Sequence, residues 1–146
     1  MEVHRLGVEE IREGELMPFT ETNFQVQTAD GRNFTLTSPA VYVTNVHNLL
    51  EKITLPVGTD SDGASIPPEC WALPGFQPFG THWRAAYVHD YLYRHTDWSR
   101  EDCDAVLLEG MHSLGVDPLH AQAIYRAVRE FGQSAFDRDR AAQASQ

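Results

Sequence analysis

The chain has 146 residues, a size that fits one globular domain with its own hydrophobic core. Hydrophobic residues make up 42% of the chain, and the formal net charge of −10 argues against binding to a nucleic-acid backbone, which requires clustered Lys and Arg. Two cysteines are too few for a disulfide scaffold and lack zinc-site spacing, so we expect a reducing compartment. No apolar run approaches the roughly 20 residues of a membrane span, and the charged N-terminus lacks the apolar stretch of a signal peptide.

The first 58 residues predict β-structure. In "NFQVQTADGRNFTL", hydrophobic and polar residues alternate on both sides of Asp30-Gly31, which is a strong signal for a hairpin. Two short β-branched runs at 40–46 and 52–58 predict further strands. Residues 59–81 are irregular, with Gly and Pro at intervals, but they hold several large apolar residues. We therefore expect a long ordered loop that packs on the core.

Three helices are expected after this loop. The first runs from about 81 to 95, and the second begins after the N-cap Ser99 and ends at Leu114. The third begins at Pro118 and continues to about 136. Because the connection between the first two is short, we expect them to be antiparallel neighbours.

Strand-like patterns before 58 and helical patterns after 81 are segregated along the chain. This order predicts an α+β fold, with an N-terminal antiparallel β-sheet of short strands packed on three C-terminal helices and a long ordered loop between them. We expect a single globular domain at residues 1–136. The polar C-terminal tail, 137–146, is expected to fray.

The apolar, aromatic run "RAAYVHDYLYRH" carries a histidine and an aspartate side by side. On a helix His89 and Tyr93 share a face, and Asp104 on the returning helix is placed to contact His89. A histidine held by a carboxylate has a fixed tautomer, so its other nitrogen can take a proton from water or a substrate hydroxyl. His89, Asp104 and Tyr93 are therefore candidate catalytic residues, with Arg100 in support. The alternative is a buried hydrogen-bond network that only joins two helices.

The segment "SDGASIP" in the long loop suggests a cation site. Gly63 permits close backbone approach. Backbone carbonyls there, with Asp62 or Asp60, could bind a hard cation, and Asp90 could complete the ligand set from the helix. Calcium is the candidate cofactor, with Asp62 and Asp90 as its candidate metal ligands, and we predict that the loop packs over the His89 end of the helix. Ser65 is an alternative nucleophile for His89. An Asx-type turn at Asp62 is the alternative to a metal site.

Three blocks, "TDSDGASIPPECW", "WRAAYVHDYLY" and "SREDCDAVLLEGMHSLGV", resemble a bacteriophage and prophage family, the domain of unknown function numbered 1353. The resemblance covers about residues 22–132. One departure is the run 59–62, where the Thr-Asp of the family pattern can match either of two pairs. The resemblance implies a phage context. We expect a virion or the cytoplasm of an infected bacterium as the location, and other phage structural proteins or a host envelope component as partners.

A second resemblance concerns mechanism. His89-Asp90-x-x-Tyr93 is similar to the helix motif of secreted phospholipases A2. That similarity implies that His89 activates a water, that Asp90 binds calcium and that Asp104 orients the histidine. The cysteines of that family's helix are absent here, as are its disulfides.

Three functions stay open. The leading interpretation is a virion or tail-associated structural protein whose His-Asp-Tyr network stabilises the fold. The alternatives are a small His/Asp hydrolase of an ester or envelope component, assisted by calcium, and an accessory protein that binds a host factor. A further arrangement, His82 with His89, Asp90 and Asp104, resembles the ligand set of metal-dependent phosphohydrolases. Those enzymes are nearly all helical, so the β-rich first half argues against it.

Overall fold

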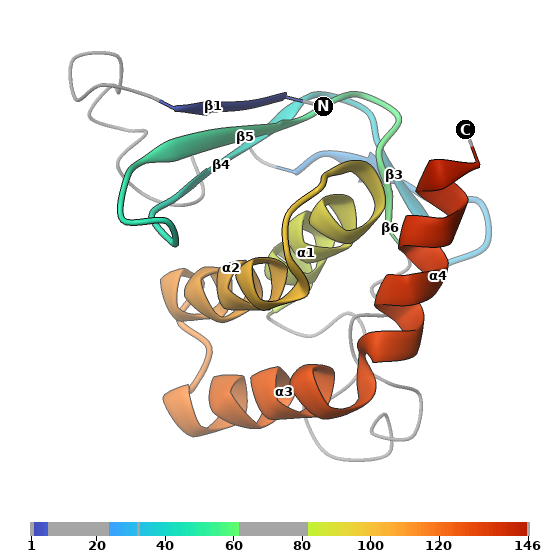
Figure 1. Ribbon diagram of the computed structural model, residues 1–146. Helices are drawn as coiled ribbons and strands as arrows, with labels where there is room; N and C mark the ends of the chain where they lie inside the picture. Colours follow the sequence, from blue (N-terminus) through green and yellow to red (C-terminus); the bar gives the residue numbers. More distant parts are fainter. Residues whose placement is uncertain (1, 6–23, 32, 62–81, 146) are drawn as a thin grey trace.

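The computed structural model describes residues 2–5, 24–31, 33–61 and 82–145. Within these ranges, short strands precede a helical part, so the predicted α+β class is confirmed (Figure 1). The predicted long loop falls mostly on residues 62–81, which lie outside the described residues.

The described strands form two three-stranded antiparallel sheets, in the orders β1-β5-β4 and β2-β3-β6. Their bounds are Glu2–Arg5 (β1), Val26–Gln27 (β2), Phe34–Leu36 (β3), Ala40–Thr44 (β4), Glu51–Leu55 (β5) and Asp60–Ser61 (β6). The predicted hairpin is confirmed, because Val26 of β2 pairs with Leu36 of β3. The Asp30 carboxylate closes its turn by accepting bonds from the backbone and side-chain N–H groups of Asn33. β1 and β6 are additions to the predicted strands, since neither sequence carries a clear alternation.

The helices of the described part are α1 (Trp83–His95), α2 (Arg100–Ser113), α3 (Pro118–Phe131) and α4 (Gln133–Ala144). The predicted start of α2 is confirmed, because the Ser99 hydroxyl accepts the Asp102 N–H at 3.1 Å. The predicted start of α3 is confirmed as well, with the Asp117 carboxylate bound to the first backbone N–H groups. No helix among the described residues is long and apolar enough to cross a lipid bilayer.

One helix boundary differs from the prediction. The expected third helix is two helices, α3 and α4, separated at Gly132. A Cβ atom at Gly132 would lie 2.4 Å from the carbonyl oxygen of Val128, so only glycine fits this junction. The expectation of three helices and a fraying tail from 137 is therefore corrected, because α4 extends to Ala144.

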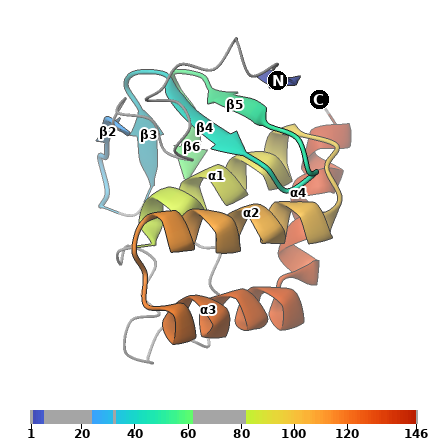
Figure 2. The ribbon, with the colours of Figure 1, turned by 90° about the vertical axis from the view of Figure 1, so that its left-hand side faces the viewer.

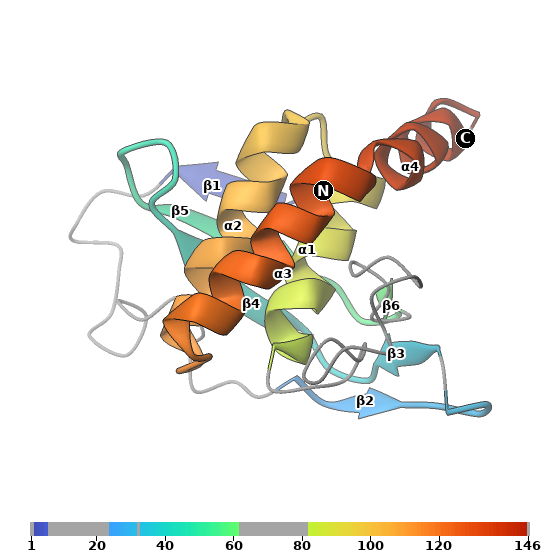
Figure 3. The ribbon, with the colours of Figure 1, turned by 90° about the horizontal axis from the view of Figure 1, so that it is seen from below.

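The elements stack in layers. Sheet β1-β5-β4 lies on one side of the α1–α2 pair, and α3 lies on the other side (Figures 1 and 2). Seen from below, α3 lies in front of α2 and α1, with α4 extending away at the C-terminal end (Figure 3). One apolar cluster joins the sheets to α1 and α2, and a second joins α1 and α2 to α3. Helix α1 is thus enclosed, and every residue from Ala85 to Tyr93 is buried.

Helix α2 is anchored to β4 through Glu109. Its carboxylate accepts bonds from the Tyr42 hydroxyl at 2.8 Å, the Thr44 hydroxyl at 2.7 Å and the Asn45 backbone N–H at 3.1 Å. Burial, together with the charge and hydrogen bond of Glu109, raises the pKa of Tyr42 well above its usual value, so this phenol stays a donor. The anchor sets the position of α2, and hence of Asp104 one to two turns earlier.

Candidate functional site

The His89 side chain of α1 meets the Asp104 carboxylate of α2. The distance from His89 Nε2 to Asp104 Oδ1 is 2.6 Å, and the Tyr93 hydroxyl donates to the same oxygen at 2.6 Å. The contact that the sequence predicted between His89 and Asp104 is therefore present, with Tyr93 in the same network. Exposure of these residues is 1% for His89, 3% for Tyr93 and 0% for Asp104, so all three are buried.

The second oxygen of Asp104 faces two cations. Arg129 of α3 donates from Nη1 to Oδ2 at 2.7 Å, and Arg100 Nε lies 3.8 Å from the same oxygen. Arg100, expected to support the site, is thus next to it. Charge-assisted bonds of this kind are stronger than bonds between neutral groups. Asp104 accordingly joins three helices through one buried carboxylate.

These contacts determine the charge of Asp104. Burial raises the pKa of Asp104. The charge of His89 and the hydrogen bonds from His89, Tyr93 and Arg129 lower it by more, so the net pKa lies below the usual value. An ionised carboxylate only accepts hydrogen bonds. The neutral tautomer of His89 that fits this acceptor carries its proton on Nε2. Burial and the Asp104 carboxylate also raise the pKa of Tyr93, so its hydroxyl stays a donor.

Asp90 has a separate set of contacts. The Ser61 hydroxyl of β6 donates to Asp90 Oδ2 at 2.6 Å, and the Asp90 side chain is buried. Three residues earlier on α1, the Tyr87 hydroxyl donates to the backbone oxygens of Phe34 and Thr59. Asp90 and Tyr87 thus tie α1 to the small sheet β2-β3-β6, on a different side from Asp104.

The calcium hypothesis depends on residues that fall partly outside the described chain. Asp62, Ser65 and the rest of "SDGASIP" lie outside the described residues, so the packing of that loop stays a prediction. Within the described ranges, no group of three His, Cys, Asp or Glu side chains is arranged to hold a metal ion. Asp90 offers one carboxylate that already accepts a bond from Ser61. This donor set does not fit calcium without further ligands, and the role of Asp90 as a ligand stays a prediction.

All four residues that resemble the metal phosphohydrolase set lie in the described part of the chain, and within that part they are not brought together as a metal-binding group. His82, His89, Asp90 and Asp104 are not among any metal-competent group. His89 and Asp104 are committed to each other instead.

Two residues of the site were missed by sequence analysis, Arg129 and Ser61. Arg129 stands beside the buried Val128 in the last turn of α3, a position where a basic residue is common, so the pattern alone did not mark it. Its contact with Asp104 depends on how α3 docks on α2. Ser61 lies in a two-residue strand, and its contact with Asp90 spans 29 positions of the chain.

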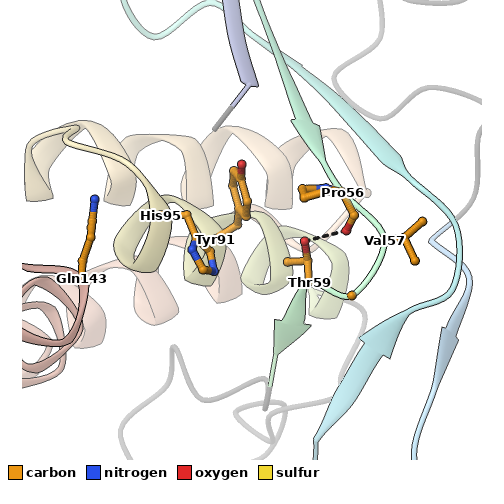
Figure 4. Close-up of a pocket in the computed structure, with 7 residues that line it drawn as sticks. Pro56, Val57, Thr59, Tyr91, His95 and Gln143 are labelled. Carbon is orange, nitrogen blue, oxygen red and sulfur yellow. Dashed lines mark hydrogen bonds between the residues drawn. The ribbon is translucent and has the colours of Figure 1, made fainter. Parts of the chain in front are cut away.

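An open pocket of about 410 Å³ lies elsewhere, between the turn after β5 and the C-terminal end of α1 (Figure 4). Tyr91, His95 and Thr59 line it, and Gln143 of α4 closes one side. Burial and the nearby Arg94 guanidinium lower the pKa of His95. Among the described residues that line the pocket, none belongs to the His89–Asp104–Tyr93 network. The described lining of this pocket is thus separate from the candidate site around His89.

Comparisons with known proteins agree with the sequence blocks described above. Residues 34–128 match the family described as "Protein of unknown function (DUF1353)". The chain is 35% identical over 81 residues to "Uncharacterized protein y4jT" of Sinorhizobium fredii (strain NBRC 101917 / NGR234). That match covers 56% of this chain and 24% of the relative, so the chain spans about a quarter of the relative's length. No solved structure matches the chain.

Proposed function

The chain belongs to the DUF1353 family, and from that premise and the geometry around His89 we propose that it is a small hydrolase of an ester or a cell-envelope component. His89 is the general base, Asp104 orients it, and Tyr93 fixes the carboxylate. The phage context and a role in infection belong to this proposal.

One observation carries the proposal. Asp104 Oδ1 accepts from both His89 Nε2 and the Tyr93 hydroxyl, each at 2.6 Å. This is the arrangement that the resemblance to phospholipases A2 implies for a histidine that activates water. The helix spacing of His89 and Tyr93 and a carboxylate on the antiparallel helix combine to produce it. A histidine held in this way has its tautomer and ring orientation set before a substrate arrives.

The proposed reaction needs only water. The His89 imidazole takes a proton from water while the water oxygen forms a bond to the acyl carbon. The resulting imidazolium gives that proton to the leaving alcohol oxygen as the carbon–oxygen bond breaks, yielding an acid and an alcohol. Asp104 stays ionised throughout and stabilises the imidazolium. Its lowered pKa suits this role, because a carboxylate that resists protonation keeps its hydrogen bond to His89.

The test is ester turnover by the purified chain with two probes, a fluorogenic short-chain acyl ester and phospholipid vesicles, each with and without calcium. We expect His89→Gln to lower kcat by roughly 100- to 10,000-fold, the usual contribution of a general base. His95→Gln, an exposed histidine on the same helix, is the matched control and should turn over normally. Equal rates for wild type and His89→Gln would rule out His89 as the base.

A second function is favoured by the burial of the network. His89 and Asp104 are 1% and 0% exposed, which suits a purely structural network in a virion or tail-associated phage protein. In that case His89→Gln lowers stability by about 1–3 kcal/mol, because a buried partner loses its bond. The wild type then shows no turnover of either probe. Binding to phage structural proteins, to the host envelope or to a host factor would remain to be measured directly.

A further inference from the structure

The two oxygens of Asp104 have different partners. Oδ1 faces α1 and accepts from His89 and Tyr93, whereas Oδ2 faces α3 and accepts from Arg129. A carboxylate rotates about the bond to its Cβ, and rotation would exchange or misalign the two oxygens. The strongest contact opposing that rotation from the Oδ2 side is Arg129, at 2.7 Å against 3.8 Å for Arg100.

Arg129 is itself held in place by Arg100 of α2. Arg100 Nη2 donates to the carbonyl oxygens of Val128, at 2.9 Å, and of Arg129. Its Nη1 donates to the Gln133 side chain at 3.1 Å. Arg100 therefore adds donors to the carbonyls of the last turn of α3, where the Val128 carbonyl also accepts the Gly132 N–H, and it fixes the backbone from which Arg129 extends. A second acidic neighbour competes only weakly, since Glu101 is 72% exposed and lies 3.5 Å from Arg129 Nη2.

We propose that Arg129 is a positioning residue, which holds Asp104 Oδ2 so that Oδ1 stays on His89 and Tyr93. Arg100 supports this arrangement by fixing the end of α3, and its Nε also lies 3.8 Å from Asp104 Oδ2. This inference deepens the proposed hydrolase and rests on it for its catalytic meaning, but the contact itself is testable without activity. Docking of α3 is thereby linked to the orientation of the His89 ring.

The experiment records the imidazole N–H proton of His89 by NMR in the folded chain. A ring N–H bound to a carboxylate resonates far downfield, and its absence in His89→Gln assigns it. We expect the resonance to move upfield and broaden in Arg129→Gln. In Arg126→Gln, an exposed arginine of the same helix, it should stay unchanged. Guanidinium chloride at a low, non-denaturing concentration should restore the signal in Arg129→Ala, whereas equal sodium chloride should not.

Several outcomes overturn the inference. If Arg129→Gln loses thermal stability but keeps the wild-type His89 resonance, Arg129 is structural only. If Arg129→Gln does not fold, Arg129→Met repeats the measurement, because its apolar chain retains the packing of the arginine stem. An unchanged resonance in that variant also sinks the inference.

Activity measurements separate this inference from the proposed function. If the wild type hydrolyses a probe, Arg129→Gln should lower kcat by up to about 100-fold, the cost of a misplaced catalytic group, with KM unchanged. Guanidinium should restore the rate in Arg129→Ala, the variant used for rescue of the resonance. A wild type without turnover sinks the hydrolase proposal and leaves the NMR result to decide the role of Arg129. A wild type with turnover and an unmoved resonance in Arg129→Gln sinks only the Arg129 inference.

Discussion

At the residue scale, the buried polar side chains of α1 are tolerated because they have hydrogen-bond partners on other elements. Each buried polar group needs a partner, because an unsatisfied one costs free energy. His89 and Tyr93 meet Asp104, Asp90 meets Ser61, and Tyr87 reaches two backbone oxygens. The His-Asp pair in an apolar run is therefore explained by packing on two different sides of the helix, whichever function it serves.

Asp104 should make stability depend on acid. Its folded pKa lies below the ordinary 3.8, so its contribution is fully present above that pH and is lost as the pH falls through the lower folded value. We expect Asp104→Asn to cost about 3–5 kcal/mol at neutral pH, because it breaks a buried ion pair. Denaturant unfolding at neutral and acid pH measures the difference, with the exposed Asp97→Asn as control. A cost that does not shrink at acid pH would contradict the lowered pKa.

His47 should make stability depend on pH in the opposite direction. Its Nδ1 lies 2.5 Å from Glu51 and its Nε2 lies 2.8 Å from Asp102, so both ring nitrogens donate when it is charged. Burial lowers the pKa of His47, but the hydrogen bonds to Asp102 and Glu51 raise it more, to a net value above 6.5. The contribution of His47 to folding stability is therefore fully present below pH 6.5 and is lost as the pH rises through the folded pKa.

The measurement compares the melting temperatures of wild type and His47→Gln at about pH 6 and about pH 9, on either side of the histidine range. We expect a larger loss at the lower pH. Equal losses at both values would mean that His47 is not charged in the folded chain. His112→Gln, at an exposed histidine, is the control and should not show this difference between the two pH values.

At the element scale, α4 is held by polar contacts, since none of its residues is buried. Arg140 donates to the carbonyl oxygens of Tyr93 at 2.9 Å, Leu92 at 3.2 Å and Trp98 at 2.6 Å. Its guanidinium also lies 4.5 Å from the centre of the Phe136 ring. Arg140 thus caps the C-terminal end of α1 from another helix, which explains why a polar sequence is ordered there.

Arg140→Gln should release α4 while the rest of the fold persists. We expect faster amide hydrogen exchange across 133–144 and a loss of about 1–3 kcal/mol, because carbonyl groups lose a partner. Arg138→Gln is the control, since its side chain is 75% exposed. Unchanged exchange in α4 would show that Arg140 is not its anchor.

At the scale of the whole molecule, the net charge of −10 predicts self-repulsion in the folded chain. Raising the ionic strength from about 0.01 M to about 0.15 M shortens the screening length from about 30 Å to about 8 Å. We expect the melting temperature to rise over this range, because repulsion is screened while the buried Asp104 pairs are screened little. A falling melting temperature would indicate that exposed ion pairs outweigh the repulsion.

Much of the local structure was predictable from the sequence, because the signals act over a few residues. Ser99 and Asp117 cap the helices they were expected to cap, and Asp30-Gly31 makes its hairpin turn. The His89–Asp104 contact was also predictable, since helix periodicity and a short connection leave little freedom in the antiparallel pair.

Other features depended on tertiary structure. Nothing near Arg129 in the sequence indicates Asp104, and the two meet because α3 packs on α2, with the end of α3 held by Arg100. The break at Gly132 depends on the crowding of Val128, and the order of α4 depends on carbonyls that α1 presents from some 47 positions away. Local signals in the sequence thus determined most elements, apart from β1, β6 and the break between α3 and α4, and they determined the His89–Asp104 pair. The packing of α3 and α4 decided what surrounds that pair, because contacts between distant segments depend on how whole helices dock.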